Sequence, residues 1–149
     1  MKNFSSHIAI IGAGISGLTL GCQLKKNGIS VVIFEKSSTV SEQGAGISIS
    51  PNGLQVLKKI GIYEQLKNES GSAKKTNLLY NREELTSFSV DVITTTRQCL
   101  YNNLLDKYRS YDGEILFDHE VSSINLNKPE ISFLNQESVH VKHIAACDG

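Results

Sequence analysis

The segment between residues 8 and 35 constrains the fold of this chain more than any other part of it. Ile8–Ile11 is a continuous apolar run, which is typical of a strand buried on both faces of a parallel sheet. The glycine-rich segment Gly12–Gly17 follows at once. The next residues predict a helix that ends near Gly28, and Ser30–Phe34 predicts a second buried strand. The buried side of the helix is expected to carry its apolar residues, Leu18, Leu20, Cys22 and Leu24. This order predicts a βαβ unit.

The glycines lie where a dinucleotide-binding turn needs them. Gly12 permits a tight turn out of the strand, Gly14 lets a pyrophosphate approach the backbone, and Gly17 lets the helix pack close to the sheet. The phosphate charge is then expected to rest on the free N–H groups at the start of the helix. The residues of this turn are therefore predicted to bind a dinucleotide: Gly12, Ala13, Gly14, Ile15, Ser16 and Gly17.

An acidic residue, Glu35, ends the second predicted strand. A carboxylate there can accept hydrogen bonds from both ribose hydroxyls, and it repels a 2′-phosphate. Three glycines alone could form an ordinary turn, but the strand before them, the helix after them and the acid all agree. We therefore expect a bound dinucleotide rather than a purely structural βαβ unit.

A second glycine-rich loop lies within residues 42–53 and leads into a short strand and a helix. Ser50 can cap this helix, with Pro51 at its first position and Gly61 after its end. Its buried stripe is expected to be Leu54, Leu57 and Ile60. The spacing by itself fits an ordinary loop–helix connection equally well.

A further helix is predicted from Arg97 to Tyr108, because Leu100, Leu104 and Tyr108 recur at four-residue intervals. Arg97 would lie in its first turn, where a cation opposes the helix dipole. A phosphate facing Arg97 would explain this placement, and a solvated surface arginine is the alternative.

The remaining residues predict strands. Glu114–Phe117 is expected to join the parallel sheet, and Ile144–Cys147 is expected to return to it. Between them, short polar breaks predict an antiparallel three-stranded meander made of Val121–Leu126, Glu130–Leu134 and Ser138–His143. A dehydrogenase domain that binds NAD would continue with alternating helices, so this order favours FAD.

These motifs together resemble the start of the single-component FAD-dependent aromatic monooxygenases, the relatives of p-hydroxybenzoate and salicylate hydroxylases. The resemblance rests on residues 12–17, on Phe34-Glu35-Lys36 and on the loop from Gly44 to Leu54. Arg97 with Leu100 and Leu104 is similar to the family's Arg-x-x-Leu-x-x-x-Leu helix, and Asp148-Gly149 is similar to its Asp-Gly motif. The resemblance therefore runs from the first strand to the last residue.

The resemblance implies an α/β fold class, with a Rossmann-like parallel sheet of the FAD-binding, glutathione-reductase-like type and a three-stranded β-meander crossover. Residues 1–149 would form the FAD-binding domain, truncated after the Asp-Gly motif, and residues 71–94 would begin a substrate-facing sheet. From the residues themselves, Thr76–Tyr80 and Leu85–Val90 are expected to pair as strands around residues 81–84. It adds further cofactor-binding residues: Lys36, Ala45, Gly46, Arg97 (at the FAD phosphates), Val121 (near the adenine) and Asp148.

Composition and the remaining residues suggest no competing chemistry. The 15 basic residues balance the 15 acidic ones, which gives no electrostatic footprint for a nucleic acid or a membrane. Three widely spaced cysteines and a polar N-terminus favour a reducing, cytoplasmic location. His140 and His143 are expected to point to opposite faces of one strand. We expect no metal site and no catalytic residue in this chain.

Two functions stay open. The first is the FAD-binding part of a monooxygenase that uses NADH or NADPH and O2 to hydroxylate a small aromatic compound through a flavin C4a-hydroperoxide, as the resemblance implies. The second is a non-catalytic dinucleotide-binding fragment that cannot turn over without a missing C-terminal half. A lesser alternative is another oxidase or reductase that shares the first βαβ unit.

Overall fold

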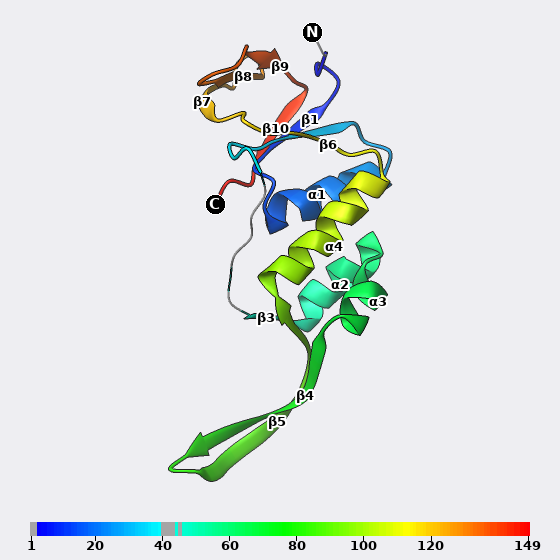
Figure 1. Cartoon of the computed structure of the whole chain (residues 1–149), viewed down its shortest axis with the longest axis vertical. Helices are drawn as coiled ribbons and strands as arrows, with labels where there is room; N and C mark the ends of the chain where they lie inside the picture. The colour runs from blue at the N-terminus through cyan, green and yellow to red at the C-terminus, as the bar shows by residue number, and fades with distance from the viewer. Residues whose placement is uncertain (1–2, 40–43, 45) are drawn as a thin grey trace. The chain divides into compact units, whose positions relative to one another are not determined.

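The computed structural model describes residues 3–39, 44 and 46–149, and the chain divides into two compact units (Figure 1). The first unit comprises Met1–Ser41 and Leu104–Gly149, and the second comprises Glu42–Asn103. The boundary passes through one helix, α4 (Arg97–Ser110). Each unit is described separately below.

The first unit contains the predicted parallel sheet. Its strands are β1 (Ile8–Ile11), β2 (Val31–Phe34), β6 (Glu114–Leu116) and β10 (His143–Ala146), in the order β10-β1-β2-β6. The chain proceeds from β1 to β2 and β6 on one side, and β10 then pairs with the other edge of β1. The strand order therefore reverses next to β1, and ligands of open α/β sheets bind at the carboxyl ends of strands beside such a reversal.

Helix α1 (Ile15–Lys26) packs on one face of this sheet through its small residues. Its buried residues are Gly17, Leu18, Gly21 and Cys22, whereas Leu20 and Leu24 are only half-buried. The expectation that all four apolar residues share the buried side is therefore wrong. The expected residues are two positions apart, and such residues face different directions on a helix. The observed buried residues are one, four and five positions apart, which places them on one side.

The C-terminal part of α4 belongs to the same unit and contributes Tyr108, which is fully buried. Its ring fits between two glycines: a Cβ at Gly21 would lie 2.8 Å from a ring atom, and a Cβ at Gly113 would lie 2.5 Å from the ring. The hydroxyl donates a hydrogen bond to the Glu114 carbonyl at 3.1 Å. Burial raises the pKa of Tyr108, so the phenol stays neutral at ordinary pH.

Replacing Tyr108 with Phe is expected to lower the free energy of unfolding by about 1 kcal/mol, because the Glu114 carbonyl loses its donor while the ring still fills its slot. Urea denaturation followed by circular dichroism measures the change. Tyr80→Phe is the matched control, since the Tyr80 side chain is 66% exposed. Equal destabilisation by both changes would contradict the assignment.

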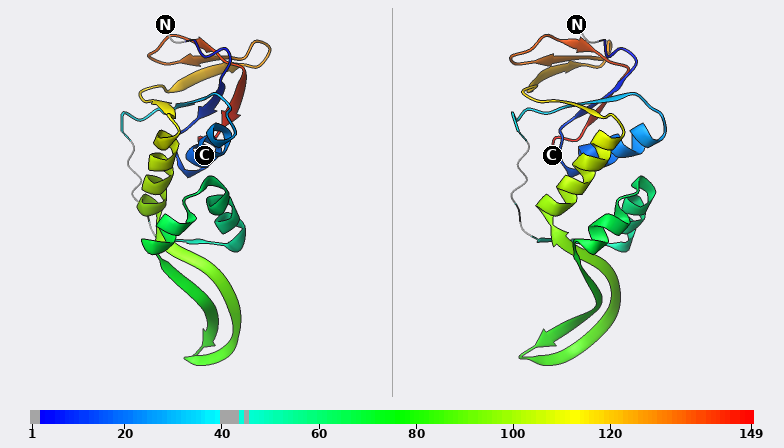
Figure 2. Two further views of the ribbon diagram at one scale, coloured as in Figure 1. Left: turned by 90° about the vertical axis from the view of Figure 1, so that its right-hand side faces the viewer. Right: turned by 45° about the vertical axis from the view of Figure 1, so that its right-hand side comes forward.

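The other face of the parallel sheet is covered by the predicted meander, formed by β7 (Val121–Asn125), β8 (Glu130–Phe133) and β9 (Val139–His140). The core between the two sheets contains residues from both: Phe4, Ala9, Ile11, Val32, Phe34, Ile131, Phe133 and Val141. Figure 2 shows the meander stacked on the sheet at the end of the unit that carries the N-terminus.

The last meander strand is shorter than predicted, and His143 belongs to β10. His140 and His143 therefore lie on different strands, so the expectation of one strand is wrong. The Val141 N–H donates to the Pro129 carbonyl, and the Lys142 N–H already donates to the His7 carbonyl. The chain thus leaves the meander between these two residues.

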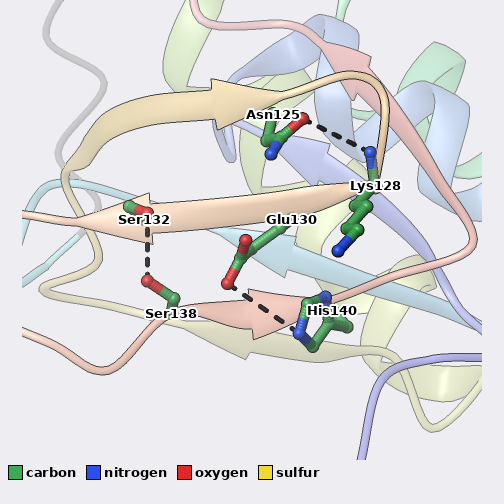
Figure 3. A network of polar contacts seen from close by, with 6 residues as sticks. All are labelled: Asn125, Lys128, Glu130, Ser132, Ser138 and His140. Atoms are coloured by element: carbon green, nitrogen blue, oxygen red, sulfur yellow. Dashed lines mark hydrogen bonds and ion pairs between the residues drawn. The ribbon is translucent and has the colours of Figure 1, made fainter.

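Polar contacts on the exposed side of the meander fix its turn and its short last strand (Figure 3). The Asn125 side-chain oxygen accepts the Lys128 N–H at 3.3 Å. The Ser138 hydroxyl donates to the Ser132 hydroxyl at 3.0 Å, and the His140 ring lies 3.8 Å from the Glu130 carboxylate. Exposed pairs of this kind contribute little to stability, and the Glu130–His140 pair is consistent with the register, in which these two residues lie opposite each other.

The second unit contains β3 (Gly46–Ile49), β4 (Gly71–Tyr80) and β5 (Glu83–Thr96) in an antiparallel sheet of order β3-β5-β4, with two helices. The helices are α2 (Pro51–Ile60) and α3 (Tyr63–Asn68). Ser50 occupies the predicted cap position of α2, although its side chain makes no capping hydrogen bond, and Gly61 ends the helix with φ +82°. The predicted buried stripe is confirmed: Leu54, Leu57 and Ile60.

Strands β4 and β5 form a long hairpin that extends away from the helices of its own unit (Figure 2). The predicted pairing is confirmed, with longer strands and a tight turn at Asn81 and Arg82, where φ is +51° and +69°. Towards this turn, Leu78, Tyr80 and Phe88 are 52%, 66% and 53% exposed. The hairpin thus presents apolar side chains that the described residues of its own unit leave exposed.

Candidate dinucleotide-binding site

The predicted glycine turn lies at the carboxyl end of β1, and its geometry explains two of the three glycines. Gly12 has φ +98°, and a Cβ on it would lie 2.7 Å from the Cys147 carbonyl oxygen. A Cβ on Gly17 would lie 2.0 Å from the Gly12 carbonyl oxygen and 3.3 Å from the Ile10 side chain. The turn therefore folds back onto the first turn of α1, which leaves no space for a side chain at either position.

Gly14 differs from these two glycines. It is the N-cap residue of α1, with φ −72° and ψ −175°, a conformation that any residue adopts. Its carbonyl accepts the Leu18 N–H at 2.9 Å, which starts the helix. The backbone conformation therefore does not by itself require glycine here, and close approach of a ligand is the reason for glycine that the dinucleotide-binding motif supplies.

The start of α1 provides an anion-binding surface. The first N–H groups of any α-helix lack intrahelical partners, and here they include those of Ile15, Ser16 and Gly17. The N-cap residue Gly14 has no side chain that could cap these N–H groups, and the first turn holds no acidic residue. The N–H groups and the positive end of the helix dipole thus favour a phosphate at this position.

The Glu35 carboxylate closes the turn from the end of β2. Its Oε2 accepts the Ala13 N–H at 2.8 Å, and its Oε1 accepts the Ser37 N–H at 2.9 Å. The predicted residues Ala13 and Glu35 are thus brought together, and the Ala13 N–H is directed at the carboxylate rather than at a phosphate. An ionised carboxylate has about four acceptor positions, so Glu35 keeps capacity to accept a ribose hydroxyl beside the hydrogen bonds from Ala13 and Ser37.

Burial alone would raise the pKa of Glu35, but the hydrogen bonds from Ala13 and Ser37, and the charge of Lys36, outweigh it and lower the pKa. Glu35 is therefore ionised at neutral pH. Because its pKa is lower in the folded than in the unfolded chain, the carboxylate stabilises the fold above the ordinary carboxyl range. This contribution is lost as the pH falls through the folded pKa.

Asp148 lies on the far side of the turn, after β10. The Cys147 N–H donates to the Ile11 carbonyl at 2.8 Å, and a Cβ on Gly12 would lie 3.1 Å from the Asp148 Cα. The last predicted cofactor-binding residue is therefore adjacent to the first one, at the carboxyl ends of neighbouring parallel strands. Lys36 follows Glu35 and is exposed.

Two residues beside Glu35 were not predicted from the sequence, Asp118 and His119. The His119 N–H donates to the Glu35 carbonyl at 2.9 Å, and the Asp118 N–H donates to the Ser37 carbonyl at 3.2 Å. Val121, predicted to lie near an adenine, is half-buried and packs against the core between the two sheets. The segment that follows β6 therefore borders the acid at the end of β2.

The remaining predicted residues belong to the second unit. Arg97 is the first residue of α4, and the Thr96 hydroxyl caps this helix by accepting the Cys99 N–H at 3.1 Å. A Cβ on Gly44 would lie 3.0 Å from the Arg97 Cδ, so Gly44 lies against the aliphatic part of the Arg97 side chain. Gly46 begins β3 and pairs with Thr96. Ala45 lies outside the described residues.

A cavity of about 510 Å³ lies beside these residues in the second unit, lined by Gly46–Ser48, Glu69–Gly71, Thr94–Thr96 and Cys99. The Asn103 amide donates to the Glu69 carboxylate at 2.7 Å, which lowers the pKa of Glu69. The residues that line the cavity include five with hydroxyl side chains and one with a carboxylate, Glu69. No cluster of potential metal ligands occurs among the described residues. None of the described helices is long and apolar enough to cross a membrane.

Comparison with known protein families shows to which family this chain belongs. The model of the FAD binding domain matches residues 5–149. The chain belongs to this FAD-binding domain family of flavin monooxygenases. Monooxygenase 1 of Arabidopsis thaliana is 29% identical over 149 residues, which cover 95% of this chain and 38% of the relative. The FAD-dependent monooxygenase subE of Metarhizium robertsii is 35% identical and covers 68% of this chain and 36% of the relative.

Solved structures agree in fold. The tetrameric form of 2-methyl-3-hydroxypyridine-5-carboxylic acid oxygenase superposes with a TM-score of 0.89 at 24% identity, over 97% of this chain and 40% of that chain. The p-nitrophenol 4-monooxygenase PnpA of Pseudomonas putida gives 0.87 at 20% identity, over 100% and 42%. At this identity the likeness shows the fold, and this chain spans about two fifths of the length of these proteins.

Proposed function

We propose that this chain binds FAD as the cofactor-binding part of a monooxygenase that uses NADH or NADPH and O2 to hydroxylate a small aromatic compound. The observation that carries the proposal is the ionised Glu35 carboxylate, held by the Ala13 N–H beside the open N-terminus of α1. The family match supports FAD as the dinucleotide. The names of relatives and neighbours, such as p-nitrophenol 4-monooxygenase, support the reaction class.

The residues present fit an FAD molecule. The N–H groups of Ile15, Ser16 and Gly17 would hold its pyrophosphate, and Glu35 would accept the ribose hydroxyls. The proposal also includes FAD contacts from the other residues predicted to bind the cofactor: Lys36, Ala45, Gly46, Arg97, Val121 and Asp148. When bound and reduced, the flavin supplies the oxygen chemistry, while this chain binds and orients it.

We further propose that the hairpin of β4 and β5, including residues 71–94, begins a substrate-facing sheet. The exposed Leu78, Tyr80 and Phe88 support this assignment, because apolar side chains on a two-stranded ribbon are stable only when further structure covers them. That cover would come from additional polypeptide of the same enzyme.

A cytoplasmic location is part of the proposal. The three cysteines, Cys22, Cys99 and Cys147, are all free, and burial raises the pKa of Cys22 to about 11. Free thiols persist in reducing compartments. The balance of 15 basic and 15 acidic residues supports a small-molecule substrate rather than a nucleic acid or membrane partner.

A second candidate function is FAD binding without turnover. It is favoured by the fact that the chain spans 38% of Monooxygenase 1 and 40% of the pyridine-carboxylate oxygenase. Titration of the purified chain with FAD, read by flavin absorbance and fluorescence and with NAD as competitor, tests both candidates. Saturable binding that NAD does not displace supports them. Hydroxylated product formed with NADPH-dependent oxygen consumption separates the first from the second, and no FAD binding contradicts both.

Replacing Glu35 with Ala is expected to weaken FAD binding by about 2 kcal/mol, roughly thirtyfold, because a charge-assisted contact to the ribose is lost. The dissociation constant from the same titration measures the effect. Glu120→Ala removes the same charge from an exposed residue of the same unit and is expected to leave binding unchanged. An unchanged dissociation constant for Glu35→Ala would refute the ribose role.

A further inference from the structure

We propose that His119 is a positioning residue for Glu35: its imidazole fixes the kinked segment after β6 that holds the acid in place. This inference rests on the proposed function for its effect on FAD. Its structural part, the orientation of the Glu35 carboxylate, is testable without any ligand.

Both peptide groups of Glu35 are bonded to the segment that follows β6. The Glu35 N–H donates to the Leu116 carbonyl at 2.9 Å, and the Glu35 carbonyl accepts the His119 N–H at 2.9 Å. The pairing of β2 with β6 thus continues past the ends of both strands. The position of Glu35 therefore depends on the conformation of residues 117–119.

That conformation is unusual. Asp118 has φ +57°, which is uncommon for a residue other than glycine. In this conformation its N–H reaches the Ser37 carbonyl at 3.2 Å, and the Ser37 N–H in turn donates to the Glu35 carboxylate at 2.9 Å. The left-handed residue thus links the segment to both the backbone and the side chain of the acid.

The imidazole of His119 stabilises the left-handed backbone conformation at Asp118 through a hydrogen bond. Its Nδ1 lies 2.6 Å from the Phe117 carbonyl oxygen, and because a carbonyl only accepts, Nδ1 must carry the proton. This hydrogen bond spans the left-handed Asp118. Without this hydrogen bond, only the two backbone contacts to Glu35 and Ser37 would offset the conformational free energy of the left-handed Asp118.

The ring is also wedged between the sheet and the meander. Its centroid lies 5.6 Å from that of Phe34, the residue before Glu35, and 5.0 Å from that of Phe133. Aromatic packing alone would make His119 an ordinary core residue. The hydrogen bond to the Phe117 carbonyl gives His119 the positioning role that we propose. Variants that remove either the ring or the N–H donor separate packing from hydrogen bonding.

The two test variants keep one contribution each. His119→Phe keeps the aromatic packing and loses the donor, whereas His119→Asn loses the ring and keeps an N–H donor near the position of Nδ1. The first readout is the pKa of Glu35, followed by carboxyl-carbon NMR. We expect the pKa of Glu35 to be low in the wild type and in His119→Asn, and to rise towards its ordinary value in His119→Phe. An unchanged pKa in His119→Phe would overturn the inference.

The second readout is the affinity of each variant for FAD, which is compared with its free energy of unfolding. We expect His119→Phe to bind FAD about fivefold more weakly than wild type and His119→Asn to bind within about twofold, although the latter is the less stable protein. The opposite order of affinity, following stability, would show a purely structural role and overturn the inference. His140→Phe, on the meander surface, is the matched control. Failure of the wild type to bind FAD would refute the proposed function, and the NMR readout would still decide the role of His119.

Discussion

Replacing Gly17 with Ala is expected to lower the free energy of unfolding by about 4 kcal/mol, enough to leave much of the chain unfolded. The new Cβ would lie 2.0 Å from the Gly12 carbonyl oxygen. That carbonyl has no room to move, because Gly12 is held by the hydrogen bond from its N–H to the Phe34 carbonyl at 2.8 Å and lies against the Cys147 backbone. The loss of stability arises because the Cβ itself collides with the backbone. The position of Cβ does not depend on the side-chain rotamer, so no change of rotamer removes the collision.

Urea denaturation followed by circular dichroism measures this loss. Gly14→Ala is the matched control: it adds the same methyl group three residues earlier, at φ −72°, and is expected to cost at most about 1 kcal/mol. A Gly17→Ala variant as stable as Gly14→Ala would show that helix and turn do not pack as described.

Replacing Gly14 with Val is expected to abolish detectable FAD binding while the chain stays folded. The backbone conformation at Gly14 is open to valine, so the loss of stability should stay near 1 kcal/mol. The isopropyl group would occupy the path by which a pyrophosphate reaches the N–H groups of Ile15 and Ser16. The expected loss of affinity, at least about a hundredfold, exceeds that of Glu35→Ala because the whole phosphate site is blocked, not a single contact.

Flavin titration measures the affinity of Gly14→Val, and unfolding of the same sample verifies its fold. Gly14→Ala should fall between the valine variant and the wild type, since its side chain is smaller. Binding of FAD by Gly14→Val within a few-fold of the wild type would mean that phosphate does not approach this residue, and the assignment of the α1 N-terminus would be wrong.

Features that depend on neighbouring residues were predictable. The continuous apolar run, the glycine turn and the acid within residues 8–35 predict β1, α1 and β2 in the right order, and the hairpin, the meander and the cap position of α2 follow from similarly local patterns. The proximity of Gly44 to the Arg97 side chain is an observation of the structure that no sequence pattern predicted. The cofactor roles of Lys36, Val121 and Asp148 stay predictions.

Features that depend on distant residues were not predictable. The buried side of α1 was misjudged because Gly21 packs against Tyr108, which lies on another element. The end of β9 was misplaced because the Lys142 N–H donates to the His7 carbonyl at the other end of the chain. Neither contact leaves a signal in the local apolar pattern, since glycine and backbone groups carry no hydropathy that a pattern can detect.

The sequence by itself determined the dinucleotide-binding unit, because a turn that must fold within a few residues requires specific residue types at fixed spacing. Only the tertiary structure decided how its acid is held: Glu35 receives the Ala13 N–H across 22 positions of the chain and the His119 N–H from beyond β6. The donors of both hydrogen bonds are backbone N–H groups, whereas the acceptors are the Glu35 carboxylate and the Glu35 carbonyl. Which N–H groups reach Glu35 is therefore decided by the path of the chain and not by the identity of the donors' side chains.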